Sequence, residues 1–379
     1  MYNSIIIGAG FAGAVAAREL AERGQRKVLI IERRSHIGGN AYDCHDDAGV
    51  LVHMYGPHIF HTNDSRVYEY LSRFSEFTDY EHRVEAQLPG KTVPVPFNLT
   101  SIERVYGDRA PALIEKLLSK YAPESKIPIY ELTQQDDPEL SELADFVFNN
   151  VFKCYTEKQW GTPIAEVSKE TLSRVPVFLS RDDRYFQDKY QGMPKVSYTK
   201  LFENMLDHPN ITVRTSAEAS ELIKLEDGKI YFEGELFEGE VIYTGAADEL
   251  FDCKYGKLPY RTLDFAFETL PQDSFQSRGT INYTVSEKFT RITEFKKLTG
   301  QELSDVTTIM KEYPRAYEGG NDIPYYAILN PENLELYGKY RALADNYKNL
   351  YLLGRLAEYR YYNMDAIVGQ ALALCDKLV

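Results

Sequence analysis

The chain has 379 residues, enough for two or three domains, and its 44% hydrophobic and 26% charged residues are ordinary for a soluble globular protein. The net charge of −14 argues against nucleic acid as a partner, so an anionic ligand would need a local cluster of arginines. No apolar run reaches the roughly 18 residues of a membrane span, no room precedes the first strand for a signal peptide, and four scattered cysteines fit neither disulfides nor metal ligands, which together predict a cytoplasmic protein without metal or membrane partners.

The first predicted elements form a dinucleotide-binding unit. An apolar run at residues 5–7 predicts a buried strand, and three glycines at G-x-G-x-x-G spacing lead into a helix. Gly8 allows a tight turn, Gly10 lets the backbone approach a pyrophosphate, and Gly13 lets helix and strand pack closely. A second strand ends in Glu32, the position of an acid that binds a ribose 2′-hydroxyl. The alternative is a strand-to-helix turn without a ligand.

The residues after Glu32 favour FAD over NAD. A second glycine pair, Gly38-Gly39, lets another backbone segment pass close to an extended cofactor. Near the other end of the chain, a strand at 350–353 is followed by a helix at 366–378, whose N-terminus can present N–H groups to the negative edge of a reduced flavin. Both chain ends therefore predict one cofactor domain. Its candidate cofactor-binding residues are Gly8, Gly10, Phe11, Ala12, Gly13, Glu32, Arg33, Gly39, Asn40, His58, Arg355, Met364 and Asp365.

The segment that follows carries polar aromatic residues and a long helical pattern. Residues 52–63 place histidines around a Gly-Pro turn, which indicates either backbone near a functional site or a locally bonded loop. Residues 84–97 predict a hairpin. The pattern is helical from about 101 to 174, and residues 152–161, with the only tryptophan, form either a core cluster or a pocket wall. The polar run 167–174 predicts a mobile loop or lid.

The second half of the chain returns to the cofactor sheet and then adds a further sheet. We expect a helix at 198–206, a strand at 211–213, a hairpin around Asp227-Gly228, and a strand at 241–245 followed by a helix at 246–250. Alternating apolar residues then predict an antiparallel sheet with one wet face, from strands at 263–270, 280–285 and 290–295.

These elements predict an α/β protein with a Rossmann-like FAD-binding domain, an inserted helical domain and an antiparallel β-sheet domain. The expected FAD-binding domain is discontinuous and comprises residues 1–80, 200–250 and 340–379. The helical insertion covers 100–175, with a mobile loop near 167–178, and the sheet or substrate domain comprises 81–99, 176–199 and 251–339.

Seven motifs occur in order over nearly the whole chain, at residues 8–13, 37–43, 55–62, 95–98, 155–161, 324–326 and 354–361. Together they resemble the bacterial type of the UDP-galactopyranose mutase family. The glycine motif is generic to flavoproteins, whereas the histidine motif at 55–62 and the Tyr-to-Trp motif at 155–161 are specific. The resemblance covers the chain, so it implies the family's fold and activity for the whole protein.

What the resemblance implies is an isomerase that interconverts UDP-galactopyranose and UDP-galactofuranose on FAD with no net redox change. In that family the flavin is reduced, its N5 attacks the anomeric carbon as UDP leaves, and an iminium lets the sugar ring open and reclose. The resemblance further implies a reductant such as NAD(P)H, a homodimer, and a product that feeds cell-surface polysaccharide.

Site residues carried over by motif include two arginines. Arg174 and Arg291 stand where the family has its essential arginines, suited to a pyrophosphate, although each alone could be a surface residue. His58 would lie near the flavin N5, and Asn282 would reach the sugar-phosphate region. The uridine would be held by Phe152, Tyr155, Thr156 and Trp160, and the phosphates by Tyr185, Tyr326 and Tyr361.

Two departures and two rivals accompany this interpretation. Asn363 stands where the family usually has an acid, and Ala357-Glu358 replaces the more usual Gly-Thr. One rival is a flavin amine oxidase or desaturase, which would prefer an apolar pocket to arginines beside a Tyr/Trp wall. The other is a binding protein without flavin, similar to Rab GDP-dissociation inhibitors, against which the intact glycines and Glu32 argue.

Overall fold

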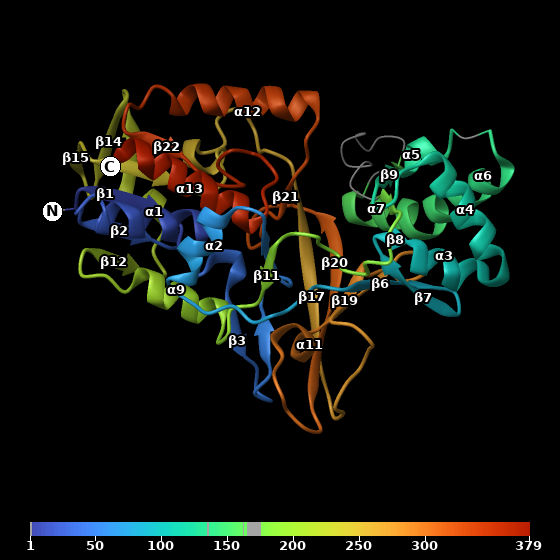
Figure 1. Ribbon diagram of the computed structural model, residues 1–379. Helices are drawn as coiled ribbons and strands as arrows, with labels where there is room; N and C mark the ends of the chain where they lie inside the picture. The colour runs from blue at the N-terminus through green and yellow to red at the C-terminus, as the bar shows by residue number, and fades with distance from the viewer. Residues whose placement is uncertain (1, 135, 162, 165–175) are drawn as a thin grey trace.

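The computed structural model describes residues 2–134, 136–161, 163–164 and 176–379. It is an α/β fold with three parts, as Figure 1 shows: a parallel sheet with its helices, a helical unit, and a long mixed sheet between them. The expected Rossmann-like fold class is therefore confirmed. Among the helices of the described residues, none is long and apolar enough to cross a membrane.

The cofactor sheet joins segments from both ends and the middle of the chain. Its five strands are all parallel, because each lies between helices or crossovers. In spatial order they are β12 (Ile211–Arg214), β2 (Val28–Ile31), β1 (Ser4–Ile7), β16 (Glu240–Tyr243) and β22 (Leu350–Leu352). The strands expected at 211–213, 241–245 and 350–353 are thus confirmed, but the helix expected at 246–250 is wrong. Only a short 3-10 turn, η5 (Glu249–Phe251), follows β16.

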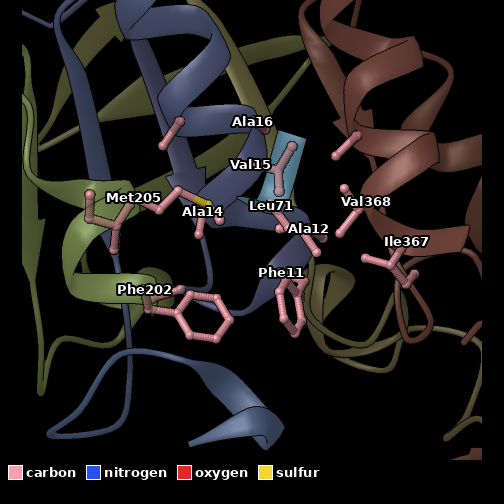
Figure 2. Close-up of a cluster of buried hydrophobic side chains, with 14 of the residues drawn as sticks. Phe11, Ala12, Ala14, Val15, Ala16, Leu71, Phe202, Met205, Ile367 and Val368 are labelled. Carbon is pink, nitrogen blue, oxygen red and sulfur yellow. The ribbon is translucent and has the colours of Figure 1, made fainter. Parts of the chain in front are cut away.

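Small residues let helices pack closely on this sheet. Helix α1 (Phe11–Glu22) contacts α13 (Met364–Leu378) and α9 (Tyr198–Leu206). Helix α2 (Ser65–Ser72) lies nearby and contacts α13. Figure 2 shows the α1 side chains between those of α9 and α13, with Phe11 against Phe202 and Ala12 near Ile367. Five of the first seven residues of α1 are alanine or glycine, so the neighbouring helices approach its backbone closely. This packing ties the C-terminal helix to the N-terminal one.

A helical unit with its own apolar core is inserted after the hairpin at residues 84–95. A small sheet, β8 (Phe97–Asn98), β10 (Pro176–Phe178) and β9 (Lys126–Pro128), closes one side of it. Of the mobile loop predicted near 167–178, only 176–178 are described, and they form β10. The helices are α3 (Leu99–Tyr106), η2 (Gly107–Arg109), α4 (Ala110–Lys120), α5 (Ile129–Leu132), α6 (Pro138–Val147), the π-helix η3 (Phe148–Lys153) and α7 (Cys154–Trp160).

A seven-stranded sheet connects the helical unit with the cofactor sheet (Figure 1). Its order is β21 (Tyr326–Ala327), β17 (Tyr260–Leu270), β20 (Thr307–Ala316), β19 (Arg291–Glu294), β18 (Thr280–Tyr283), β6 (Val84–Leu88) and β7 (Lys91–Val95). The hairpin expected at 84–97 is confirmed. The sheet is antiparallel except for the parallel β18–β6 pair. Its longest strand pair is β17 with β20, and β20 is a strand that the sequence pattern did not predict.

The remaining elements are short, apart from one helix. The last residue of the strand expected at 290–295 instead starts α11 (Phe295–Thr299), and α12 (Pro331–Ala344) was not predicted. The hairpin expected around Asp227-Gly228 is confirmed by β13 (Ile223–Glu226) and β14 (Lys229–Phe232). The others are β3 (Asp43–His45), β4 (Leu51–His53), β5 (Phe60–Thr62), β11 (Tyr190–Gly192), β15 (Glu235–Phe237), α10 (Ala219–Leu222) and η1 (Gly39–Ala41).

Candidate active site

A large cavity lies where the cofactor sheet, the seven-stranded sheet and the helical unit meet. Its volume is about 2320 Å³. Sites for one drug-sized ligand measure about 300–1,000 Å³, so this cavity has room for a cofactor and a second ligand side by side. It runs from the β1–α1 turn, past strands β18 and β19, to Tyr155 on α7.

The turn between β1 and α1 opens into one end of the cavity. Gly8 has a φ of +103°, a conformation that residues with a side chain rarely adopt. A Cβ on Gly39 would lie 2.8 Å from the Cα of Gly10, so two loop backbones meet there. A Cβ on Gly13 would lie 2.0 Å from the Gly8 carbonyl oxygen, so this third glycine sets the packing of α1 on β1. No side chain caps α1, whose N-terminus can therefore receive an anion.

The acid at the end of β2 is fixed by backbone donors. Glu32 is 6% exposed, and its two carboxylate oxygens accept hydrogen bonds from the N–H of Ala9 at 2.8 Å and of Arg34 at 2.9 Å. These bonds hold the carboxylate at the cavity wall beside the glycine turn. Arg33 also lines the cavity, where its guanidinium pairs with Glu249 at 2.7 Å.

A buried donor without a protein partner also faces this end of the cavity. The Arg34 guanidinium stacks 4.2 Å from the centre of the Tyr55 ring, and its Nη2 donates to the Asn40 Oδ1 at 2.8 Å. Its Nη1 is buried without a hydrogen-bond partner among the described residues, which is costly unless a ligand supplies an acceptor. The glycine cradle, the uncapped helix and this unpartnered donor together fit FAD.

A second helix N-terminus faces the same cavity. Asn363 precedes α13 without capping it through its side chain, and Asn363 and Met364 line the cavity. The N–H groups of this first turn are thus available to a negatively charged group. Asp365 does not line the cavity. Its carboxylate instead accepts a hydrogen bond from the Thr62 hydroxyl at 2.9 Å.

His58 lies in the cavity wall as a neutral imidazole. Its Nδ1 is 2.8 Å from the Gly56 carbonyl oxygen, which can only accept, so Nδ1 carries the proton and Nε2 is an acceptor. Burial, with the nearby His53, lowers the pKa of His58 to about 3. The ring is therefore uncharged near neutral pH and presents no cation of its own.

One rung of the seven-stranded sheet aligns three polar side chains across neighbouring strands. Asn282 on β18 pairs in register with Arg291 on β19, which pairs with Glu312 on β20. Directly opposed residues share a face of the sheet, and Asn282 and Arg291 both line the cavity. Glu312 is 1% exposed, and its Oε1 accepts a hydrogen bond from the Arg291 Nε at 2.6 Å.

This pairing determines the state of Arg291. Burial lowers the pKa of Arg291, but the Glu312 carboxylate, together with Tyr155 and Tyr326, more than offsets that effect and raises it, so the guanidinium stays charged. Within the described part of the chain, its two terminal nitrogens have no hydrogen-bond partner. They form a planar pair of donors suited to a phosphate.

Tyrosines surround Arg291 and Arg355 in the cavity. Arg355 lies over the rings of Tyr361 at 4.9 Å and Tyr326 at 5.5 Å, and no described carboxylate lies within ion-pair distance of it. Tyr155 and Tyr185 lie close enough to Arg291 for its charge to oppose the rise that burial causes in their pKa. Phenol hydroxyls beside two cations form a site for a doubly charged anion.

Not every predicted site residue reaches the cavity. Phe152 is 1% exposed in the core of the helical unit, and Thr156 is 5% exposed, so both lie behind the wall rather than in it. The ring centres of Trp160 and Tyr326 are 6.3 Å apart, so Trp160 lies next to a residue that lines the cavity. Arg174 lies outside the described residues. Gly13 and Asp365 do not line the cavity either. It is lined by the candidates Gly8, Gly10, Phe11, Ala12, Glu32, Arg33, Gly39, Asn40, His58, Tyr155, Tyr185, Asn282, Arg291, Tyr326, Arg355, Tyr361 and Met364.

Two contributors were missed by the sequence analysis. Arg34 could have been suspected, because it stands between Glu32 and the second glycine pair. Glu312 carried no such signal, because its polar neighbours on β20 gave no strand pattern. Its role follows only from the pairing of β19 with β20.

A family model described as UDP-galactopyranose mutase matches residues 150–361, and one described as NAD(P)-binding Rossmann-like domain matches residues 6–74. A probable UDP-galactopyranose mutase of Klebsiella pneumoniae is 38% identical over 100% of this chain and 94% of that protein. A dTDP-fucopyranose mutase of Escherichia coli is 35% identical, covering 98% and 97%. A crystal structure of reduced UDP-galactopyranose mutase shares the fold, with a TM-score of 0.74, 15% identity and coverage of 100% and 94%.

Proposed function

The chain belongs to the UDP-galactopyranose mutase family and is a flavin-dependent isomerase, and we propose that it interconverts the pyranose and furanose forms of UDP-galactose. The observation that carries this proposal is the continuous cavity. It joins the dinucleotide-binding turn to Arg291 and Arg355. Among the described residues, the terminal nitrogens of Arg291 have no hydrogen-bond partner, and Arg355 has no carboxylate partner. A flavin and a nucleotide sugar can therefore meet inside it.

The residues of this chain prepare the reaction. When bound, reduced FAD supplies a nucleophilic nitrogen for the anomeric carbon. Arg291 and Arg355 hold the pyrophosphate and stabilise the negative charge that develops on UDP as the glycosidic bond breaks. Neutral His58 offers Nε2 as a hydrogen-bond acceptor without placing a positive charge beside the cofactor. Because bond cleavage and closure occur on one sugar, no net redox change is needed.

Recognition of the nucleotide is assigned to the α7 side of the cavity. We place the uracil and ribose against Tyr155 and the nearby Trp160, with Phe152 and Thr156 supporting that wall from behind. The phosphates lie against Tyr185, Tyr326 and Tyr361, and the sugar lies toward Asn282 and His58. Arg174 is proposed as a further phosphate ligand on its motif position alone.

The test is conversion of UDP-galactofuranose by purified protein, followed by chromatography with and without dithionite. We expect a yellow protein that forms UDP-galactopyranose only when reduced. A yellow protein that consumes oxygen or another acceptor without isomerising the sugar would favour a flavin oxidase. A colourless protein without affinity for FAD would favour a binding protein. A parallel assay with dTDP-fucopyranose distinguishes the two sugar nucleotides of the family relatives.

Finer properties of the enzyme are also proposed here. We propose a cytoplasmic homodimer that obtains electrons from NAD(P)H and whose product feeds cell-surface polysaccharide. Free cysteines Cys44, Cys154, Cys253 and Cys375 support a reducing compartment. Size-exclusion chromatography with light scattering tests the dimer, and anaerobic bleaching of the flavin by NADH or NADPH tests the reductant.

A further inference from the structure

Helix α7 carries the proposed nucleotide wall but is short and ends beside a buried cation. It spans Cys154–Trp160, follows a π-helix, and ends at Gly161 with a φ of +69°. Its last carbonyl groups cannot be satisfied within the helix. Two of them are instead met by Arg261, a residue of strand β17 that is 7% exposed.

Within the described residues, the side-chain hydrogen bonds of Arg261 all go to the end of that helix. Its Nε donates to the Gln159 carbonyl at 3.0 Å and its Nη2 to the Lys158 carbonyl at 3.4 Å. A Cβ on Gly161 would lie 2.4 Å from its Nη1, so the guanidinium packs directly on the glycine backbone. Across the described residues, no carboxylate lies within 4 Å of it.

A buried cation with no counter-ion among the described residues is costly to hold and needs a compensating environment. The negative end of a helix dipole and charge-assisted hydrogen bonds provide it here. A neutral residue could fill the same volume without this cost. The guanidinium therefore has a more specific effect than filling space, because it fixes the position of the α7 end.

A second cation ties the same turn to the other strands of the site. The Lys158 Nζ donates to the carbonyl of Tyr283, and also to those of Glu287 at 3.1 Å and Phe289 at 3.4 Å. Tyr283 is the last residue of β18, and Glu287 and Phe289 belong to the connection from β18 to β19. These two strands carry Asn282 and Arg291.

The sheet register extends the argument to the opposite wall. Arg261 pairs in register with Tyr326, the cavity-lining tyrosine next to Trp160. Arg261 of β17 therefore binds the carbonyl groups in the last turn of α7. Lys158, in the same turn, binds carbonyl groups at the end of β18 and in its connection to β19. Both walls of the nucleotide site are joined at this one turn.

We propose that Arg261 is a positioning residue of the isomerase, which holds the end of α7 so that Tyr155 and Trp160 face the nucleotide. Its removal loosens the wall and weakens binding of the nucleotide part, with less effect on the bond-breaking step. Uniform binding energy lost in this way raises KM and leaves kcat nearly unchanged. The proposal rests on the proposed function, because it requires a nucleotide in this cavity.

The experiment compares Arg261→Met with Arg18→Met as holoenzymes. Arg18 is a matched control, because its Nη1 donates to the carbonyls of Met205 at 3.3 Å and Asp207 at 3.1 Å at the end of α9, away from the cavity. Trp160, the only tryptophan, reports UDP binding by fluorescence. We expect Arg261→Met to weaken UDP binding and raise KM by about tenfold, an effect of about 1.4 kcal/mol, and Arg261→Lys to restore part of it.

The outcomes separate this proposal from the one on which it rests. Wild-type protein that does not bind UDP overturns the proposed function, whatever the variants do. Wild-type binding with an unchanged UDP affinity in Arg261→Met overturns the positioning role, and so does an equal loss in Arg18→Met.

Amide exchange in the free holoenzyme provides a readout without nucleotide. We expect faster exchange of residues 155–161 in Arg261→Met and unchanged exchange in α1; unchanged exchange of α7 overturns the proposal. If Arg261→Met does not fold, Lys158→Met is measured in its place, with the same expected loss of affinity and the same contrary result.

Discussion

At the scale of single residues, the site depends on charges that buried partners hold in place. Arg291 keeps its charge and its orientation because Glu312, on the next strand, accepts its Nε–H. His58 is kept neutral by burial and by the nearby His53, whereas its hydrogen bond to the Gly56 carbonyl fixes which ring nitrogen carries the proton. In both residues, the buried surroundings determine the protonation state and the orientation of the side chain, and the residue type alone does not.

Replacing Glu312 by alanine should lower the free energy of unfolding by up to about 3 kcal/mol, the low end of the range for breaking a buried ion pair, because the 26% exposed Arg291 keeps some contact with water. Urea unfolding of the flavin-loaded protein measures it. The double variant Arg291→Met/Glu312→Met should recover most of the loss, because both charges leave together. A loss below about 0.5 kcal/mol, as for a surface substitution, would contradict the pairing.

Acid should destabilise the protein partly through His53. Burial lowers the pKa of His53 to about 4, whereas the unfolded chain has the ordinary value of 6.5. Between these values the unfolded state binds more protons, so stability falls as the pH falls through this window, by at most about 1.4 kcal/mol per pH unit for one histidine. His53→Asn should reduce that slope between pH 6.5 and 5, measured by urea unfolding at each pH. An unchanged slope would show that His53 titrates normally in the folded protein.

At the scale of elements, the helix N-termini and helix ends set the site. Helices α1 and α13 both point uncapped N-termini at the cavity, and the close packing of these two helices fixes the distance between them. The short α7 has the opposite arrangement, because its C-terminus is held by a cation. The turn geometry of these few residues thus determines where anions can bind.

Two glycine-to-alanine substitutions should have opposite effects. Gly13→Ala places a Cβ 2.0 Å from the Gly8 carbonyl oxygen, so α1 must move away from β1, at a cost of about 1–3 kcal/mol and with weaker flavin retention. Gly338→Ala lies within α12 with no atom within 4 Å of the added Cβ, and should stabilise by about 0.5–1 kcal/mol. Thermal unfolding and the flavin-to-protein absorbance ratio measure both. Equal effects of the two substitutions would refute the packing argument.

At the scale of the whole molecule, the cavity is the junction of three parts. Its lining comes from the cofactor sheet, the seven-stranded sheet and α7, although the helical unit has a separate apolar core. A ligand in the cavity therefore contacts all three parts, and its binding energy should stabilise them together.

Free FAD at about 100 times its Kd should raise the free energy of unfolding by about 2.7 kcal/mol, which is about 3 °C in Tm for a chain of this length. Trp160 fluorescence should show this shift although Trp160 belongs to the helical unit, because the cavity couples that unit to the flavin. Flavin fluorescence of the same sample gives the second transition. A Trp160 transition that does not move with FAD would mean that the helical unit unfolds independently.

The sequence alone determined the cofactor class, the fold class and the family, each of which is confirmed. The glycine turn and Glu32 could be predicted because a G-x-G-x-x-G turn depends on local backbone geometry, as does the hairpin of β6 and β7. Helix α9 was predicted with its observed bounds, because its apolar residues recur on one face. The apolar residues of α12 do not gather in this way, and that helix was missed.

Only the tertiary structure decided how the candidate active-site cavity is built. The sequence of β20 shows no clear strand pattern. Its Glu312 can be buried because Arg291, on the neighbouring strand β19, pairs with it. Likewise, Phe152 and Thr156 carry the motif of a pocket wall but lie behind it, and Arg261 meets α7 although about a hundred residues of chain separate them. Burial and charge pairing are properties of residues that meet in space, and no local pattern of the sequence contains both partners.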